Sequence, residues 1–294
     1  MSKNLKSFHN RVAVFGGEGN MGRLTIKLFR RLGYKVFSVD PKNPKSLHAS
    51  RAIKQAQIIF FSVAPTNQIK KIINENLKLF KNHLVLDNAT VKQPLTEVYK
   101  TLDTKGVSIC SVNPLCKHDQ PLLGQKVIIL EFGKNTKKAR VLAKSLYKNA
   151  GMITMPLAFK DHDQIMLFIQ FIPHLIMRAV GRVFEKNNID MNVIEGIASA
   201  NFQLFNLSLW RTLVQDPRIS STIIHSLAKQ SKGKELMKEI ILAIEELIEQ
   251  RDEEKLAVLL KKSYLKLNKD NIGRTMNKIT TNILEQLAKQ RKSQ

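Results

Sequence analysis

Three glycines near residue 20 have the types and the spacing to bind a phosphate-bearing cofactor, following the pattern Gly-x-Gly-x-x-Gly. They come directly after the apolar segment 11–15, and an amphipathic segment begins inside the loop. In a strand–loop–helix unit such glycines permit a tight turn, close approach of the backbone to a pyrophosphate, and close packing of helix on strand. The sequence therefore predicts a dinucleotide site. The expected cofactor contacts in the loop are Gly17, Gly19, Asn20, Met21 and Gly22.

An acidic residue follows the loop at the distance that this kind of site requires. Asp40 ends the second apolar segment, 35–39, roughly twenty residues after the glycines. A carboxylate there accepts hydrogen bonds from the ribose hydroxyls and repels a 2′-phosphate, so NAD is favoured over NADP. Lys42 lies two residues further on and softens this preference, which keeps NADP as the less favoured alternative. The other alternative is a glycine-rich turn that binds no ligand.

The elements around the loop predict an α/β fold, a Rossmann-type doubly wound parallel sheet. Short apolar runs alternate with amphipathic stretches up to residue 158, as in repeated strand–helix–strand units. The run 56–63 is mostly apolar, as expected of a parallel strand that is buried on both faces. The expected strands are 11–15, 35–39, 56–63, 84–86, 107–112, 127–130 and one near 153; the expected helices are 21–32, 68–80, one opening at 94, and 137–149.

After residue 160 the pattern becomes helical throughout. We expect helices over 161–185, 193–214, 220–227 and 234–250, and a further helix near residue 294. The change of period places a boundary within 156–160, giving a dinucleotide-binding domain over 1–158 and an all-helical domain over 159–294. Two apolar stripes at helical spacing need a partner surface. They are Ile240, Ile241, Ile244, Leu247 and Ile248, and then Leu256, Leu259, Leu260 and Tyr264.

Composition limits the functional class. The chain has 294 residues, of which 43% are hydrophobic, and its longest apolar runs, such as 58–65, are too short to cross a bilayer. No apolar segment follows the basic start, and two cysteines are too few for a disulfide framework, so a cytoplasmic location is expected. The net charge of +24 suits small anionic ligands. Nucleic acid is not favoured, because recognition-helix, zinc-spacing and aromatic-basic patterns are missing. No metal site is predicted.

The segment VAVFGGEGNMGRLTIKLFRRLGYKVFSVD, residues 12–40, resembles the start of prephenate dehydrogenases, particularly the bacterial kind fused to chorismate mutase. Further motifs follow in the family's order, and the likeness extends from Arg11 to about Ile224. The resemblance implies oxidative decarboxylation of prephenate to 4-hydroxyphenylpyruvate in tyrosine biosynthesis, and a helical domain that builds a homodimer. It also places Val63 and Ala64 against the cofactor. The motifs are 61–65 (FSVAP), 86–92 (LDNATVK), 162–170 (HDQIMLFIQ), His174 and 214–217 (VQDP).

Two positions depart from the family pattern where its chemistry takes place. The catalytic histidine of the family's His-Pro pair is Asn113 here, and asparagine cannot accept a proton near neutral pH. The family's substrate-binding arginine falls on Gln203, which cannot make a bidentate fork to a carboxylate. Thr90 stands where the family has a serine hydroxyl near the nicotinamide, and Lys92 follows in the same motif.

Three further polar residues are candidates for the site. His174 lies four residues after Gln170, so both can share a helix face, and Pro173 is expected to kink that helix. A hydrogen-bonded core histidine is the alternative for His174. His118 follows Asn113 by five residues and is a candidate replacement base, with a solvated loop histidine as the alternative.

The sequence leaves three functions open. The first is an NAD-dependent dehydrogenase of prephenate, or of arogenate, with altered catalytic residues. The second is a related NAD(P)-dependent oxidoreductase that acts on a different substrate. The third is an NAD-binding protein without catalytic activity.

Overall fold

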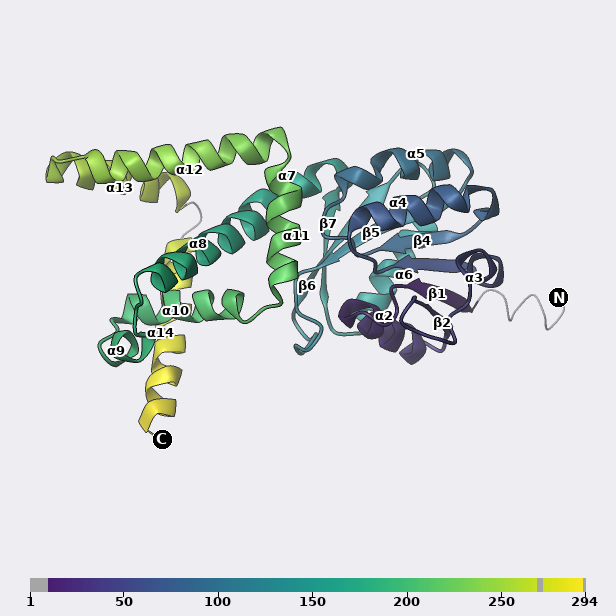
Figure 1. Ribbon diagram of the computed structural model, residues 1–294, viewed down its shortest axis with the longest axis horizontal. Helices are drawn as coiled ribbons and strands as arrows, with labels where there is room; N and C mark the ends of the chain where they lie inside the picture. Colours follow the sequence, from purple (N-terminus) through teal and green to yellow (C-terminus); the bar gives the residue numbers. More distant parts are fainter. Residues whose placement is uncertain (1–9, 269–271, 293–294) are drawn as a thin grey trace. The chain divides into compact units, whose positions relative to one another are not determined.

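The structure is a computed structural model that describes residues 10–268 and 272–292. Its contacts divide the chain into two compact units, Met1–Met166 and Leu167–Gln294, and each is described by itself (Figure 1). The division falls after Met166, whereas the sequence predicted a boundary after residue 158. The difference has a physical cause, because His162 and Asp163 form hydrogen bonds with residues of the first unit.

The described part of the first unit contains one seven-stranded sheet, with the strand order β2-β1-β3-β4-β5-β6-β7. Strand β2 lies on one side of β1 in the sheet, and β3 lies on the other side. The direction in which successive strands are added therefore reverses at β1. In open α/β sheets ligands bind at the carboxyl ends of the strands at such a reversal. The strands are β1 (Arg11–Phe15), β2 (Lys35–Val39), β3 (Ile58–Phe61), β4 (Leu84–Asp87), β5 (Ser108–Pro114), β6 (Lys126–Phe132) and β7 (Ile153–Ala158).

Helices cover both faces of this sheet. On one face α2 and α6 enclose a core of apolar side chains that includes Phe29 and Tyr147 and alternate residues of the central strands. Phe29 and Phe60 meet edge to face with their ring centroids 6.0 Å apart. Helices α4 and α5 contact each other, as Figure 1 shows. The helices are α2 (Asn20–Arg31), α3 (Ala49–Gln55), α4 (Thr66–Glu75), α5 (Thr96–Thr104) and α6 (Lys137–Lys148), with short 3₁₀ turns η1 (Leu77–Leu79), η2 (Gln93–Leu95) and η3 (Phe159–Asp161) and the one-turn helix α7 (His162–Met166).

The prediction of an α/β sheet followed by a helical domain is confirmed, with one difference in strand direction. Strand β6 pairs antiparallel with β5, while the other neighbouring strands of the described sheet pair in parallel. The ten or so residues between β5 and β6 contain no crossover helix, so β6 can only return alongside β5 in the opposite direction.

The described part of the second unit is helical. Helix α8 contacts both α10 and α11. Side chains cap several helix starts: Asp190, Ser199, Asp216 and Asp252 each accept a hydrogen bond from a backbone N–H of the helix that follows. The elements are a π-helical turn η4 (Leu167–Phe171), then α8 (Ile172–Lys186), α9 (Met191–Gly196), α10 (Ala200–Leu213), α11 (Pro217–Ala228), α12 (Ser231–Glu249), α13 (Glu253–Leu267) and α14 (Ile272–Lys292).

Two predicted helices are interrupted in the structure. The segment expected as one helix over 161–185 changes to π-helix at Leu167–Phe171, immediately before Pro173. Because proline has no N–H to donate, a wider turn before it accommodates the missing hydrogen bond. The segment expected as one helix over 193–214 is divided at residues 197–199, where Ser199 caps α10.

Within the described residues one helical stretch, Phe159–Lys186, is long and apolar enough to cross a membrane by length and composition. The predicted apolar runs are too short to cross a bilayer because they are uninterrupted stretches of sequence. The helical stretch is longer because it also includes polar residues. A helix that packs inside a soluble protein passes the same test.

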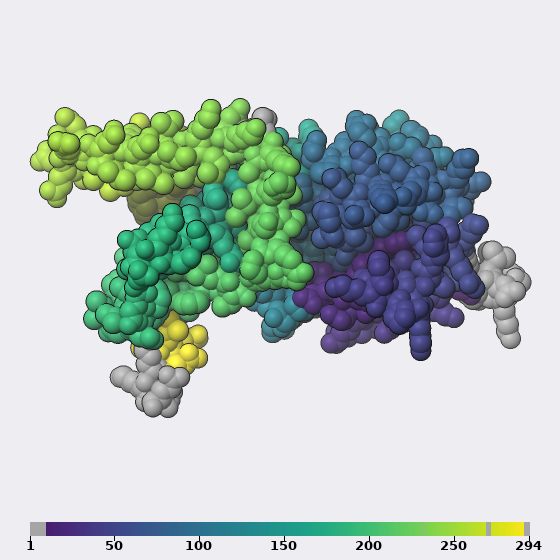
Figure 2. Space-filling model, viewed as in Figure 1, coloured from purple at the N-terminus to yellow at the C-terminus, as the bar shows by residue number. Residues whose placement is uncertain are grey.

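Many apolar side chains of the last three helices are exposed. On α12 the exposed fractions are 49% for Ile241, 51% for Ile244 and 76% for Ile248, and these residues share one helix face. Helices α12 and α13 lie at the surface, in light green in Figure 2. The unit therefore has a large apolar surface that the described residues leave exposed.

Candidate functional site

The glycine loop connects β1 to α2 and leaves no room for a side chain at Gly16, Gly17 or Gly22. Gly16 has φ +76°, in the left-handed region that favours glycine, and its amide donates to the carbonyl of Val39 (2.9 Å). A Cβ on Gly17 would collide with the Ser38 side chain, and one on Gly22 would collide with the Gly16 backbone. Gly19 precedes α2 and provides no side-chain cap, and the first turn has no acidic residue. The N–H groups of that turn are therefore not capped by a side chain, and the loop backbone beside them has no side chains at its crowded glycines. This arrangement fits a pyrophosphate, which would accept hydrogen bonds from these N–H groups.

Asp40 lies beside this loop at the end of β2 and is 8% exposed. One carboxylate oxygen accepts the amide N–H of Glu18 (3.1 Å), and the other accepts the amide N–H of Lys42 (3.0 Å). These bonds hold the carboxylate still while leaving lone pairs for further donors. The residues expected against the cofactor after β3, Val63 and Ala64, follow Ser62, whose amide donates to Phe15 of β1 (2.8 Å). Val63 lies next to the glycine loop, since a Cβ on Gly16 would come within 3.2 Å of its side chain, and Ala64 is the next residue in the chain.

A fully buried ion pair supports the loop after β4. The Nζ atom of Lys92 donates to Oδ1 of Asp87 (2.7 Å) and to the carbonyl of Val112 (2.9 Å). Asp87 also accepts hydrogen bonds from the hydroxyls of Tyr99 (2.7 Å) and Ser111. Burial lowers the pKa of Lys92, although Asp87 acts in the opposite direction, and burial raises the pKa of Tyr99 well above its ordinary value. Lys92 is therefore a structural partner of Asp87, and the half-buried Thr90 lies two residues before it.

Asn113, at the end of β5, is bonded to a buried histidine–aspartate pair. The side-chain amide of Asn113 lies 3.0 Å from Nε2 of His162, and Nδ1 of His162 lies 2.7 Å from Oδ1 of Asp163. Asp163 also accepts the amide N–H groups of Lys92 and Gln93. His162 is 0% and Asn113 is 4% exposed.

The surroundings of this pair assign its protonation. Burial lowers the pKa of His162; the hydrogen bond with Asp163 acts in the opposite direction but does not outweigh burial, and the nearby Lys92 ammonium also lowers the pKa. Burial disfavours the Asp163 carboxylate, but hydrogen bonds from His162, Lys92 and Gln93 outweigh this and lower its pKa. A neutral His162 that donates from Nδ1 to Asp163 has its lone pair on Nε2, where it accepts the Asn113 N–H. This fixes the Asn113 amide, so that its oxygen is the group available to accept a further hydrogen bond.

His162 and Asp163 begin the motif 162–170, but neither was predicted to take part in the site. The adjacent His-Asp pair was the available signal, but nothing local showed that it bonds to residues 49 and 71 positions away. His118 is exposed, in the loop after β5, and no hydrogen bond joins it to Asn113 among the described contacts.

In the second unit, His174 is held in one orientation. Its Nδ1 lies 2.9 Å from the hydroxyl of Ser220, which also accepts a hydrogen bond from Nε of Arg178 (3.1 Å). Because Ser220 accepts from Arg178, its own proton can be donated to Nδ1 of His174, which leaves an N–H on Nε2. Burial lowers the pKa of His174, and Arg178 lowers it further. His174 is therefore a neutral hydrogen-bond donor.

Gln170 and Gln203 are the other two residues that the sequence placed at the substrate. Gln170 is the fourth residue of the π-helical turn, and its Oε1 is buried without a partner in the described structure. Gln203 is on α10, where its amide donates to the carbonyl of Ala198 (3.0 Å).

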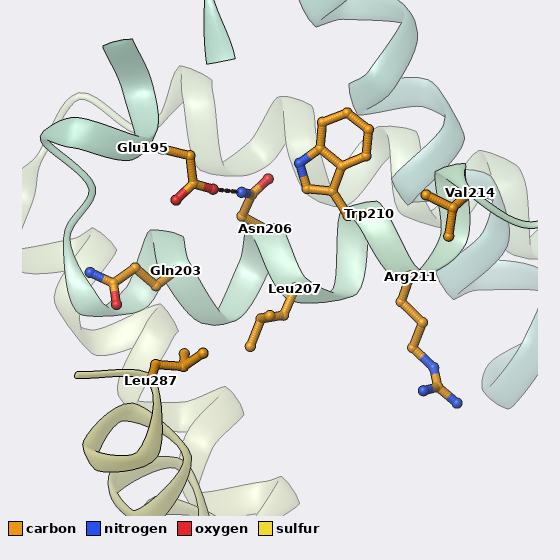
Figure 3. A pocket seen from close by; sticks show the side chains of 8 residues that line it. All are labelled: Glu195, Gln203, Asn206, Leu207, Trp210, Arg211, Val214 and Leu287. Atoms are coloured by element: carbon orange, nitrogen blue, oxygen red, sulfur yellow. Dashed lines mark hydrogen bonds between the residues drawn. The ribbon is translucent and has the colours of Figure 1, made fainter. Parts of the chain in front are cut away.

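A cavity of about 380 Å³ adjoins Gln203 between α10 and α14 (Figure 3). Two of its lining residues are bonded to each other, since the side-chain amide N–H of Asn206 donates to the carboxylate of Glu195. The Oδ1 atom of Asn206 is buried and has no hydrogen-bond partner among the described residues. Arg211 also lines the cavity, but Figure 3 shows its side chain directed away from Glu195 and Asn206. The remaining lining residues are Leu207, Trp210, Val214 and Leu287.

Within the described residues no group of three His, Cys, Asp or Glu side chains is arranged to hold a metal ion. Of the two cysteines, Cys110 is buried and Cys116 is half-buried, and neither forms a disulfide. Burial raises the pKa of Cys110 to about 12, which makes its thiol a poor nucleophile.

Part of this chain matches a known family, and two curated proteins are similar to most of it. Residues 159–262 match the family described as prephenate dehydrogenase, dimerization domain. A T-protein of Enterobacter agglomerans is 24% identical over 216 residues, which are 73% of this chain and 56% of that protein. A probable arogenate/prephenate dehydrogenase of Methanocaldococcus jannaschii is 20% identical over 234 residues, 74% of this chain and 52% of that protein. The chain spans about half the length of these curated relatives.

The fold is also found in solved structures. The crystal structure of prephenate dehydrogenase from A. aeolicus, in complex with hydroxyphenyl propionate and NAD⁺, superposes with a TM-score of 0.64. It is 19% identical, and the alignment covers 87% of this chain and 96% of that one. The resemblance found in the sequence is confirmed: residues 159–262 match the prephenate dehydrogenase dimerization domain, and the chain is similar to curated proteins of that family over about three quarters of its length. The solved structure shows that the fold is shared.

Proposed function

We propose that the protein is an NAD-dependent dehydrogenase that acts on prephenate or arogenate, with weakened activity. The observation that supports this most strongly is the glycine loop with Asp40 beside it, in a chain of the prephenate dehydrogenase family. Prephenate is the first choice, with oxidative decarboxylation to 4-hydroxyphenylpyruvate as the reaction. We also propose that the chain is a cytoplasmic homodimer, paired through its helical unit.

The cofactor is proposed to be NAD. The similar protein from A. aeolicus was solved with NAD⁺. In this chain the N-terminal turn of α2 would hold the pyrophosphate, and Asp40 would accept the ribose hydroxyls. Val63 and Ala64 would line the same cradle. When bound, NAD⁺ supplies a hydride acceptor, and the protein's own task is to bind and orient the substrate.

The residues at the ends of β4 and β5 are suited to orient a hydroxyl group. Asn113 has its amide nitrogen bonded to His162, so its oxygen can accept a hydrogen bond from the substrate's ring hydroxyl. Thr90 would offer a second hydroxyl contact. Neither side chain accepts a proton near neutral pH, so the proton must leave more slowly than it would to an imidazole base.

The residues of the helical unit are suited to bind a carboxylate weakly. His174 offers a neutral N–H, and Gln203 and Gln170 offer amides. A hydrogen bond from a charged group is worth about 1.5–3 kcal/mol, roughly twice a neutral one. The losses of charge at Gln203 and of basicity at Asn113 act on binding and on proton transfer, which explains why we propose weakened activity.

The same two losses support the alternatives. A related oxidoreductase whose substrate has no carboxylate at this position would not need a charged residue in place of Gln203. A regulatory NAD-binding protein would need neither residue. Both alternatives keep the glycine loop and Asp40.

The test is turnover with two substrates. Purified protein is incubated with NAD⁺ and either prephenate or arogenate, and NADH formation is followed against a control without protein for spontaneous breakdown. Turnover of either substrate supports the proposal. No turnover of either, together with measurable NAD⁺ binding, would exclude it in favour of the alternatives.

A further inference from the structure

A second carboxylate lies on the glycine loop itself, beside the residue that ends β2. Glu18 occupies the position between Gly17 and Gly19. Its Oε1 accepts a hydrogen bond from the hydroxyl of Ser38 (2.6 Å) and another from the side-chain amide of Asn43 (3.3 Å). Its backbone N–H donates to Asp40 (3.1 Å). The Glu18 side chain is therefore held across the end of β2, from two residues before Asp40 to three residues after it.

This arrangement puts two negative charges at one end of the proposed dinucleotide cradle. Asp40 is placed for the ribose hydroxyls, and Glu18 is fixed to the residues on both sides of it. A 2′-phosphate on that ribose would bring two further negative charges against this pair. The nearest opposite charge in sequence is Lys42, which is exposed and is anchored to Asp40 only through its backbone N–H.

We infer that Glu18 is a second specificity residue, which excludes 2′-phosphorylated dinucleotides together with Asp40 and offsets the attraction of Lys42. This rests on the proposed dinucleotide site. It goes beyond that proposal because it assigns a role to the side chain of Glu18. The residues on either side, Gly17 and Gly19, have no side chain and can contact a cofactor only through their backbone. The substrate class that it selects is a dinucleotide with a free 2′-hydroxyl.

Glu18→Gln isolates the charge from the structure. Glutamine keeps an oxygen that can accept the hydrogen bonds from Ser38 and Asn43, and it adds no bulk. Glu97→Gln is the matched control: it removes the same charge from an exposed side chain on α5 that pairs with Lys100. The complete set is wild type, Glu18→Gln, Asp40→Asn, the double variant of both, and Glu97→Gln.

The measurement is the dissociation constant of NADH and of NADPH, by fluorescence titration at low and at high salt. For Glu18→Gln we expect NADPH to bind about tenfold more tightly, as for one unit charge removed from near a phosphate, while NADH binding changes less than about twofold. The double variant should gain more for NADPH than either single variant. High salt should reduce the gain because it screens the repulsion. Glu97→Gln should leave both constants unchanged.

The outcomes separate this inference from the proposed function. If neither dinucleotide binds the wild-type protein, the proposed function fails. If NADH binds and Asp40→Asn alone improves NADPH binding, with Glu18→Gln equal to wild type, the inference about Glu18 is wrong and the dinucleotide site remains. If Glu18→Gln weakens both dinucleotides equally, Glu18 only shapes the loop, and the inference is also wrong.

Discussion

The side-chain amide of Asn113 donates to Nε2 of His162, 3.0 Å away, and Asp163 binds the other nitrogen of that imidazole. The three residues form a buried chain that ends at Asn113, which the sequence resemblance aligns with the family's catalytic histidine. In this chain the last member cannot take up a proton. If the proposed function is correct, the residues that would support a base are present, and the base itself is replaced by Asn113.

Asn113→His should restore proton transfer. The introduced imidazole can donate one N–H to His162, which leaves its other nitrogen to accept the substrate's proton. General bases contribute about 10²–10⁴ in rate, so kcat with prephenate and NAD⁺ should rise by a factor in that range. The new activity should fall below a pH of about 6.5, as the imidazole becomes protonated. Steady-state kinetics across pH measures both effects.

Asn113→Gln is the control for this variant, because it changes the size of the side chain without adding a base. Unchanged turnover in Asn113→His, in a protein that still binds NAD⁺, would mean that the prephenate pocket is not present. A gain of the same size in Asn113→Gln would show that space, and not basicity, limits the reaction.

The buried pair of Lys92 and Asp87 should be important for stability. Both side chains are 0% exposed, and Lys92→Met leaves the Asp87 carboxylate buried without its cationic partner. Removing one partner of such a pair costs about 3–5 kcal/mol, so the free energy of unfolding in urea should fall by about this amount. Lys100→Met breaks the exposed pair with Glu97 and should cost less than about 1 kcal/mol. Equal effects of the two variants would contradict the prediction.

The cofactor loop could be predicted from the sequence because its cause is local. Glycine spacing and the position of Asp40 after β2 are fixed within about thirty residues. The bond from Asn113 to His162 joins residues 49 positions apart, and no periodicity encodes it. The bonds of Glu18 to Ser38 and Asn43 were not predicted although these residues are only 20 and 25 positions away, because the glycine pattern specifies the backbone and not the side chain between its glycines.

The helical pattern predicted where helices lie but not where they are interrupted. The apolar spacing continues through 197–199. The predicted helix is nevertheless interrupted there, because Ser199 accepts a backbone N–H at the start of α10 and so begins a new helix. The π-helical turn before Pro173 likewise leaves the apolar pattern intact. The antiparallel direction of β6 depends on its pairing with β5, because a strand of apolar residues has the same pattern in either direction.

Acidification should destabilise the folded protein before its carboxylates titrate. Burial lowers the pKa values of His83, His162 and His174 below the ordinary value of 6.5. These histidines are neutral when folded, whereas the unfolded chain takes up their protons near pH 6.5, so the free energy of unfolding falls as the pH drops below that value. Urea unfolding at a pH of about 7.5 and of about 5.5 measures the loss.

His83→Gln tests whether these histidines cause the loss of stability. Of the three, His83 is the one outside the proposed site. His83 accepts the N–H of Lys81 on Nδ1 (3.0 Å) and contacts the carbonyl of Ile53 through Nε2 (3.0 Å), a pattern that suits only the neutral ring. The variant should lose less stability than wild type between the two pH values. An equal loss would exclude His83 as a contributor.

The exposed stripe on α12 should form part of a dimer interface. Ile241, Ile244 and Ile248 lie on one helix face and are 49%, 51% and 76% exposed, within the region that matches the dimerization-domain family. Light scattering should give about twice the chain mass of 33.5 kDa for the wild type. Ile244→Glu combined with Ile248→Glu should give the mass of one chain, because two buried charges without partners cost more than a dimer contact supplies.

Glu239→Ala is the control, since position 239 is two residues before Ile241 and lies on the opposite side of the helix. It should leave the mass unchanged. A wild-type mass equal to one chain at micromolar concentration would refute the dimer, and a double variant that stays dimeric would move the interface to another face of the helical unit.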